Sequence, residues 1–308
     1  MAAAALLAID WGTTSARAYR VAAQGDILDT RSAPLGITQV ADARFAEAFD
    51  QLTGDWRDEG VPRLACGMIG SRQGWVEAPY IACPAPLTDL VAGIVYTPGR
   101  ELGIVPGVRT RDANGTPDVM RGEETQILGG VDQREERVLV ALPGTHGKWA
   151  LVEDGRIVEF ATFMTGEVWQ ALISHTILGR LAVAPPPGAV PGRGFDRGVE
   201  RGAGPGSFLH DVFGARTLAL MNELAPEDVS DWLSGMMIGR EVRNARVWAN
   251  QHGYDGARVR LIGDDALVAR YARALAHDDV TVEPVASHAA ARGLWRIALS
   301  AGLIADLR

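Results

Sequence analysis

A faint internal repeat limits the folds open to this chain of 308 residues. Residues 6–28 contain a predicted strand, a Gly-Thr turn, a second predicted strand and a turn at Gly25. Residues 138–158 repeat this order, with Gly155 in the second turn. Each half therefore opens with a β-hairpin whose turn carries small and hydroxyl residues. Two such hairpins, one in each half, predict a duplicated domain with a nucleotide held between the copies.

Composition and charge exclude several classes of protein. The chain is 47% hydrophobic with a net charge of −8, and its basic residues do not gather in one segment. This argues against nucleic acid or an anionic membrane surface as a partner. No apolar run reaches the ~18 residues of a membrane span, and the apolar start lacks the basic region of a signal peptide. Cys66 and Cys83 have no metal-ligand spacing, so we expect core thiols in a reducing, cytoplasmic protein.

Strand-like and helix-like segments alternate along the chain, which predicts α/β layers. Helix signals are found over residues 42–56, 123–131, 166–181, from 230 or 231 to about 248, and after Gly263 to about 276. Buried strands are predicted at residues 64–69 and 259–262. Residues 184–206 are rich in proline and glycine, which predicts a mobile loop.

Lys148 is the single lysine among 30 basic residues, and it lies in the segment Leu-Pro-Gly-Thr-His-Gly-Lys-Trp at residues 142–149. A lysine presents a compact point charge and an arginine a planar fork, so a site that needs one cation at one atom would keep lysine. A strand that ends in a Gly/Thr turn can cradle a phosphate through backbone N–H groups. Gly144, Thr145 and Lys148 are therefore candidate phosphate-binding residues. The alternative is a surface lysine retained by chance.

The corresponding turn of the first half reads Asp-Trp-Gly-Thr-Thr-Ser from Asp10. A carboxylate at the end of a buried strand is costly unless it is paired or lies near a cation. The hydroxyls of Thr13 and Thr14 suit phosphate oxygens. The alternative is a tight hairpin in which Asp10 caps the turn.

Residues 67–75, Gly-Met-Ile-Gly-Ser-Arg-Gln-Gly-Trp, have the composition of a ligand-binding loop at a strand end. Arg72 can bind a carboxylate through two parallel hydrogen bonds, and Ser71 and Gln73 can bind hydroxyls. The alternative is a surface loop with an exposed arginine.

Arg-Gly-Glu-Glu-Thr-Gln at residues 121–126 places two carboxylates at a predicted helix start. Glu123 and Glu124 are candidates for acid/base chemistry. They can equally serve only to complement the helix dipole.

Two weaker motifs follow in the second half. Thr-Gly-Glu at residues 165–167 can close a substrate pocket, and Gly-Asp-Asp at residues 263–265 can let a nucleotide base approach the backbone. Each can equally be a capped helix start. The six histidines show no metal spacing, and His146 lies in the second phosphate-like turn.

Together these motifs resemble those of the 2-dehydro-3-deoxygalactonokinases, a family of the actin/hexokinase/Hsp70 ATPase superfamily. The resemblance covers essentially the whole chain and rests on residues 8–15, 66–75, 120–124, 142–149, 165–167 and 234–241. The first hairpin is generic to the superfamily, whereas the blocks at 67–75 and 142–149 are far more specific. The resemblance implies an α/β fold of two ribonuclease-H-like lobes, residues 1–133 and 134–308, with MgATP in the cleft between them.

The implied reaction moves the γ-phosphoryl group of ATP to the 6-hydroxyl of 2-dehydro-3-deoxy-D-galactonate, in galactonate and galactose catabolism. The resemblance implies that the β/γ-phosphates are bound by Gly12, Thr13, Thr14, Gly144, Thr145 and Lys148. It places Gly235 and Gly263 on the adenosine side. It also implies that Asp10 orients Mg²⁺ through water. Glu123 is the candidate base, with Glu124 second. Arg72 would hold the sugar-acid carboxylate, while Ser71, Gln73 and Glu167 would read its hydroxyls.

Other readings stay open. One is a kinase for another sugar acid, such as 2-dehydro-3-deoxygluconate, because the sequence does not resolve the configuration at one carbon. Another is a phosphatase of the exopolyphosphatase type, because Gly-Glu-Glu at residues 122–124 resembles a motif of those enzymes. A non-enzymatic sugar-sensing protein of the same fold is disfavoured, since only about five residues precede the first strand and no basic arm is present. The expected partners are a sugar acid and ATP, and a homodimer is compatible with the sequence.

Overall fold

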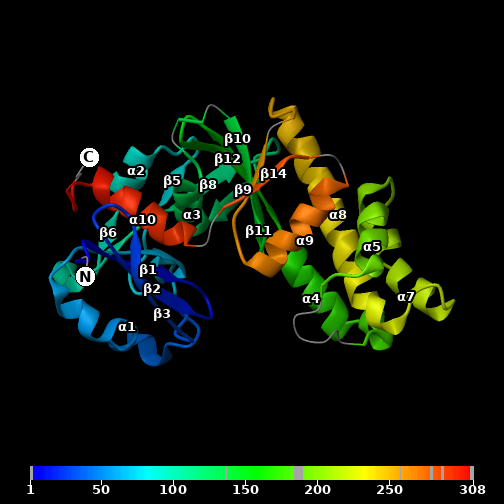
Figure 1. The fold of residues 1–308 in the computed structure, drawn as a ribbon, viewed down its shortest axis with the longest axis horizontal. Helices are drawn as coiled ribbons and strands as arrows, with labels where there is room; N and C mark the ends of the chain where they lie inside the picture. The colour runs from blue at the N-terminus through cyan, green and yellow to red at the C-terminus, as the bar shows by residue number, and fades with distance from the viewer. Residues whose placement is uncertain are drawn as a thin grey trace. The chain divides into compact units, whose positions relative to one another are not determined.

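The computed structural model describes residues 3–132, 134–135, 137–183, 190–256, 258–277, 280–285 and 288–305. The chain forms two compact units. The first contains Met1–Arg137, Val152–Phe160 and Val285–Arg308, and the second contains Val138–Leu151 and Ala161–Pro284. Helices and strands alternate in both, as the pattern of the sequence predicts (Figure 1).

The main sheet of the first unit has six strands in the order β3-β2-β1-β4-β7-β6. The strands are β1 (Leu6–Trp11), β2 (Ala16–Val21), β3 (Ile27–Ala33), β4 (Arg63–Gly67), β6 (Val95–Tyr96) and β7 (Gly103–Ile104). β1 pairs antiparallel with β2 and parallel with β4. The carboxyl ends of β1 and β4 therefore lie at one edge of the sheet, where ligands bind in open α/β sheets.

A smaller sheet and four helices complete the first unit. The sheet has the order β5-β8-β9, with β5 at Tyr80–Ala82, β8 at Gly107–Arg111 and β9 at Pro117–Met120. The helices are α1 (Phe45–Thr53), α2 (Leu87–Ala92), α3 (Glu123–Gly130) and α10 (Ala289–Ser300). The apolar residues of α1, predicted from their helical spacing, pack into the core with β1 and β2.

The second sheet has five strands in the order β12-β11-β10-β13-β14. They are β10 (Arg137–Leu142), β11 (Gly147–Glu153), β12 (Arg156–Phe163), β13 (Val259–Leu261) and β14 (Val282–Pro284). β13 runs parallel to β10, so their carboxyl ends share an edge. The helices of the second unit are α4 (Thr165–His175), α5 (Arg193–Ala203), α6 (Phe208–Asp211), α7 (Gly214–Leu220), α8 (Val229–Gln251) and α9 (Asp265–Ala276).

Both predicted hairpins are present, as β1–β2 and β10–β11. The second turn of each half contains a glycine in the left-handed region, with φ of 93° at Gly25 and 71° at Gly155. Side chains other than glycine rarely adopt this conformation, which explains why both halves place glycine there.

The predicted loop over residues 184–206 is wrong in its second part, where the structure has α5. Residues 184–189 lie outside the described part of the chain. The glycines of α5 serve close packing against α8: a methyl group at Gly198 would lie 2.1 Å from the carbonyl oxygen of Trp232. Glycine here permits two helix backbones to approach, so its usual value as a turn signal misled the prediction.

The division into units also differs from the predicted boundary after residue 133. Helix α10, near the end of the chain, packs against α3 and β1 and so belongs to the first unit. The repeat in the sequence marks where each sheet begins, but it carries no information about where the last helix packs.

Cys66 is buried and Cys83 half-buried, and both are free thiols. Among the described residues, no helix combines the length and the apolar character that a membrane crossing requires.

Candidate active site

The first Gly/Thr turn joins β1 to β2 and is hydrogen-bonded to the segment that follows β3. The N–H groups of Ile37 and Thr38 donate to the carbonyls of Gly12 and Thr13, each at 3.1 Å. The side chains of Thr13 and Thr14 are exposed. The carbonyls of Gly12 and Thr13 are thus occupied, whereas the side chains of Thr13 and Thr14 lie at the surface.

Asp10 lies near the end of β1 and is half-buried. It stands opposite Arg17 of β2 and Cys66 of β4 in the sheet register. Burial raises the pKa of Asp10, the positive charge of Arg17 opposes that rise, and the negative charge of Glu123 adds to it. The structure thus brings Asp10 and Glu123 close enough for their charges to interact.

Helix α3 starts beside the end of β4. Gly122 immediately precedes it with φ of 107°, and a methyl group there would lie 3.1 Å from the Cα of Gly67. This close approach places the acidic first turn of α3 at the same sheet edge as Asp10. The predicted helix start at Glu123 is confirmed.

The two adjacent glutamates have different surroundings. Glu124 has no exposed surface, and its carboxyl group accepts from the N–H of Gly122 at 2.7 Å and the hydroxyl of Thr125 at 2.9 Å. Burial, with the charge of Glu123 second, raises the pKa of Glu124 to about 8. Glu123 is only half-buried, and its Oε2 accepts from the N–H of Arg121 at 3.0 Å. Glu123 is therefore the better placed of the two to meet a substrate.

The acids at this edge fit a divalent cation. Burial and the charge of Glu123 both raise the pKa of Asp10, and a cation here would favour the ionised carboxylate, as the charge of Arg17 already does. Mg²⁺ keeps several waters and needs only one or two carboxylates, so Asp10 can hold it through water. No group of three or more His, Cys, Asp or Glu side chains is arranged as a metal cage within the described ranges.

The predicted sugar-acid loop follows β4 and turns through residues 68–74. Arg72 is 84% exposed, and its Nε lies 3.7 Å from the Oε1 of Glu77, so the guanidinium is open to a ligand. Gln73 is exposed as well. Ser71 is buried, and among the described residues no group hydrogen-bonds to its Oγ.

Arg121 differs from Arg72 in being buried. Its Nη2 donates to the carbonyl of Ala78 at 2.8 Å, and its guanidinium stacks on the ring of Tyr80 at 4.2 Å. Arg121 therefore ties the start of α3 to residues 78–80, a structural role that its position beside two acids in the sequence did not suggest.

The second Gly/Thr turn joins β10 to β11 and lies against the start of α4. Lys148 is 5% exposed, and its Nζ donates to the carbonyl of His146 at 3.2 Å. The N–H of Glu167 donates to the carbonyl of Thr145 at 3.1 Å. The imidazole Nε2 of His146 contacts Oε2 of Glu167, so this carboxylate already has a partner on the turn.

The close approach of α4 depends on Gly166. A methyl group at this position would lie 2.6 Å from the carbonyl oxygen of Gly144. The Thr-Gly-Glu motif therefore packs directly on the turn that carries Gly144 and Thr145.

The two glycines predicted for the adenosine side have different positions. Gly263 follows β13 at the same edge as the second turn, and the N–H of Ile262 donates to the carbonyl of Ala141 at 3.0 Å. Gly235 instead faces α5, where a methyl group would lie 2.1 Å from the carbonyl oxygen of Phe195. Its position gives Gly235 a helix-packing role and leaves no room for a nucleotide.

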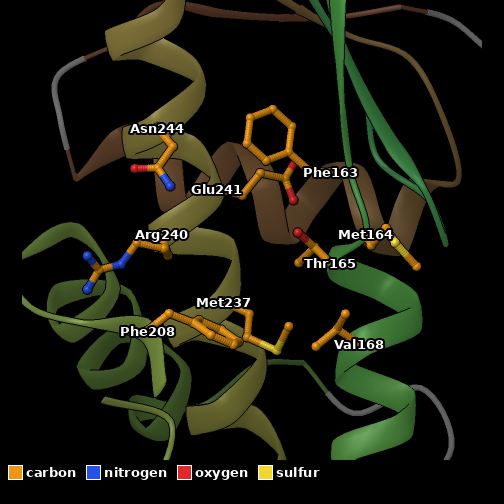
Figure 2. A pocket seen from close by; sticks show the side chains of 9 residues that line it. All are labelled: Phe163, Met164, Thr165, Val168, Phe208, Met237, Arg240, Glu241 and Asn244. Carbon is orange, nitrogen blue, oxygen red and sulfur yellow. The ribbon is translucent and has the colours of Figure 1, made fainter. Parts of the chain in front are cut away.

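One buried carboxylate beside the second turn was missed by the sequence analysis. Glu241 of α8 is 3% exposed and lines a pocket with the end of β12 and the start of α4 (Figure 2). Its signal in the sequence was a charged residue at the end of the segment Ser-Gly-Met-Met-Ile-Gly-Arg-Glu, residues 234–241. Such residues are rarely buried unless they are paired.

Comparison with known proteins decides the family. The family model described as 2-keto-3-deoxy-galactonokinase matches residues 10–297. The chain belongs to this family. Its sequence-based identification as an ATP-dependent kinase of the 2-dehydro-3-deoxygalactonokinase family is confirmed.

Individual relatives agree with the family match. The 2-dehydro-3-deoxygalactonokinase of Escherichia coli (strain K12) is 35% identical over 271 residues, which cover 87% of this chain and 88% of the relative. A crystal structure of a candidate 2-dehydro-3-deoxygalactonokinase from Sinorhizobium meliloti superposes with a TM-score of 0.84 at 34% identity, covering 95% of this chain and 98% of that one.

A distant structure shares only the fold of this kinase family. The activator of the 2-hydroxyisocaproyl-CoA dehydratase from Clostridium difficile, solved with bound ADPNP, has a TM-score of 0.50 at 11% identity, covering 98% of this chain and 94% of that chain. The predicted fold class, two α/β lobes of the actin/hexokinase/Hsp70 type, is confirmed.

Proposed function

We propose that this kinase transfers the γ-phosphoryl group of ATP to the 6-hydroxyl of 2-dehydro-3-deoxy-D-galactonate and releases ADP and the 6-phosphate. Membership of the family over residues 10–297 is the observation that carries the proposal. The chemistry at the two sheet edges supports it, because phosphoryl transfer depends mainly on positioning and on neutralising phosphate charge.

In this proposal each unit has a phosphate-binding turn. Gly12, Thr13 and Thr14 offer hydroxyls and backbone on a turn that residues 37 and 38 brace. Gly144 and Thr145 do the same in the second unit, where Lys148 supplies the positive charge. Gly263 lines the adenosine side.

Glu123 acts as the base. The 6-hydroxyl oxygen forms the new bond to the γ-phosphorus, the bond to the β–γ bridging oxygen breaks, and the hydroxyl proton passes to the carboxylate of Glu123. Glu124 is enclosed and keeps its own proton near neutral pH, since its pKa is raised to about 8. It supports the start of α3 and takes no part in proton transfer.

Asp10, at the end of β1, would hold Mg²⁺. When bound, the ion would neutralise charge on the phosphates of ATP. The turn that follows Asp10 carries the threonine hydroxyls.

The sugar acid is bound by the loop after β4. Arg72 pairs with the carboxylate, and Ser71 and Gln73 bind hydroxyls. Glu167 contributes from the start of α4 together with its partner His146. Because the reaction consumes ATP, we also place the enzyme in the cytoplasm, and the homodimer stays a prediction.

A coupled assay of ATP consumption over a panel of sugar acids tests the function. We expect the highest kcat/KM with 2-dehydro-3-deoxy-D-galactonate, a clearly lower value with 2-dehydro-3-deoxygluconate, and no phosphate release from polyphosphate. A preference for the gluconate epimer would reassign the substrate. Phosphate release without ATP would favour the phosphatase reading.

A further inference from the structure

The carboxylate of Glu241 joins the elements that surround the second phosphate turn. Its Oε1 accepts from the indole Nε1 of Trp149 at 2.8 Å, and its Oε2 accepts from the hydroxyl of Tyr271 at 2.7 Å. The side chain of Thr165 also hydrogen-bonds to it. These three donors come from β11, α9 and the first residue of α4. A buried carboxylate is costly, and three converging donors are what allows it to stay there.

The bond to Trp149 bears directly on Lys148. Adjacent residues of a strand point to opposite faces of the sheet, and a slip of one residue would exchange them. Holding the indole of Trp149 on the face of α8 therefore keeps the side chain of Lys148 on the other face. There its Nζ lies 3.2 Å from the carbonyl of His146, within the phosphate turn.

The absence of a side chain at Gly147 leaves space for this carboxylate. A methyl group at Gly147, the first residue of β11, would lie 3.3 Å from Oε1 of Glu241, closer than most side-chain contacts. Glycine at this position lets the carboxylate approach the strand at the point where the turn ends. Figure 2 shows Glu241 pointing from α8 toward Thr165, which begins α4.

We propose that Glu241 is a positioning residue of the kinase: it fixes the register of β11 and the start of α4, and thereby presents Lys148 to the phosphates of ATP. It does not touch the reacting atoms. This inference rests on the proposed function, because it takes Lys148 as the phosphate-binding cation.

The chain offers a matched pair of variants. Trp149→Phe and Tyr271→Phe each remove one hydrogen bond to the same carboxylate, but only Trp149 neighbours Lys148. We expect Trp149→Phe to lower kcat by about tenfold or more and to weaken the binding of a non-hydrolysable ATP analogue, as loss of phosphate charge stabilisation does. Tyr271→Phe should keep kcat within about threefold of wild type, although its melting temperature falls as well.

Variants at Glu241 itself separate hydrogen bonding from bulk. Glu241→Leu should lose about 100-fold in kcat with little change in the KM of the sugar acid, and Glu241→Gln, which can still bond to Trp149, should restore most of that loss. Asp211→Asn is the control for a buried carboxylate, since Asp211 is 1% exposed and pairs with Arg201 and Arg240, neither of which belongs to the turn. It should lower the melting temperature and leave kcat nearly unchanged.

Equal losses of kcat in Trp149→Phe and Tyr271→Phe, or activity that follows melting temperature in every variant, would overturn the inference. If Glu241→Leu fails to fold, the two phenylalanine variants still decide it. A wild-type enzyme that transfers no phosphoryl group to sugar acids would refute the proposed function. The binding of the ATP analogue to each variant would then still test the role of Glu241.

Discussion

The two Gly/Thr turns have the same backbone plan and opposite chemistry. In the first unit the turn after β1 adjoins the carboxylates of Asp10 and Glu123, whose charges repel each other. In the second unit the turn after β10 adjoins Lys148, and the carboxylate of Glu167 is engaged by His146. Two carboxylates thus lie beside the first turn, and an ammonium group lies beside the second. In the proposed function, the carboxylates would serve deprotonation and metal binding, and the ammonium group would neutralise phosphate charge.

Each unit also has a buried carboxylate near its turn, Glu124 in the first and Glu241 in the second, and the two differ in their hydrogen-bond donors. Glu124 in the first unit is buried with two hydrogen bonds and a raised pKa of about 8. Glu241 in the second unit is buried with three donors, and burial raises its pKa too. In the proposed function, each of these carboxylates supports a neighbour in the sequence or in space: Glu124 supports Glu123, and Glu241 supports Lys148.

Lys148→Arg gives the largest expected effect and tests the second turn. Turnover should fall by roughly 10²–10³-fold, because the guanidinium cannot place its charge where the ammonium does. Steady-state kinetics measures it, with Arg156→Lys, an exposed position on the same sheet, as the control. Near wild-type turnover in Lys148→Arg would contradict the proposal that phosphoryl transfer requires an ammonium group at this position.

Glu123→Gln tests the acids of the first turn. We expect kcat to fall about 10²-fold while both KM values change little, because an amide cannot accept the hydroxyl proton. Glu124→Gln is the matched control on the same helix, and it should keep most of the activity. A normal Glu123→Gln enzyme beside an inactive Glu124→Gln enzyme would reverse the assignment. If both variants are active, the base lies elsewhere, with Asp10 the next candidate.

Arg72→Ala tests whether the loop after β4 binds the sugar acid. The KM for sugar acids should rise about tenfold, the lower end of the range for a lost charged hydrogen bond, because Arg72 is largely exposed. The KM for ATP should stay constant. Glu77→Gln, which removes the nearby carboxylate, should leave the sugar-acid KM unchanged or lower it. An unchanged KM in Arg72→Ala would place the carboxylate site elsewhere.

A separate prediction concerns stability and the buried Glu124. Its folded-state pKa of about 8 lies above the ordinary value of 4.5, so the folded protein binds the extra proton between these values. The free energy of unfolding should therefore decrease as pH rises from about 4.5 to about 8, by an amount on the order of a few kcal/mol. Urea titrations of wild type and Glu124→Gln should diverge over this interval, with the variant more stable at the alkaline end. Parallel curves would contradict a buried, protonated Glu124.

The sequence predicts the parts of this molecule that depend on local pattern. The hairpins, the helix start at 123 and most of the strand predicted at 64–69 follow from apolar runs and turn residues, which act over a few positions. That strand ends at Gly67, and a short 3₁₀ helix follows over Met68–Gly70. Gly235 and the loop at 184–206 were misread because a glycine at a helix–helix contact looks like a turn or ligand glycine until its neighbour is known. The roles of Glu241 and Arg121 depend on partners far away in the sequence, at Trp149 and Ala78, which no local pattern reveals.

The central assignment gives nucleotide binding to Lys148 in the second unit and sugar-acid binding to Arg72 in the first. Equilibrium binding of each ligand to two variants tests this assignment most directly. Isothermal titration calorimetry would measure a non-hydrolysable ATP analogue and the sugar acid separately on wild type, Lys148→Met and Arg72→Ala. We expect Lys148→Met to weaken nucleotide binding by about tenfold or more and to leave sugar-acid binding within about twofold of wild type, and Arg72→Ala to do the reverse. Weakening of the same ligand by both variants, or of neither ligand by Lys148→Met, would contradict the assignment.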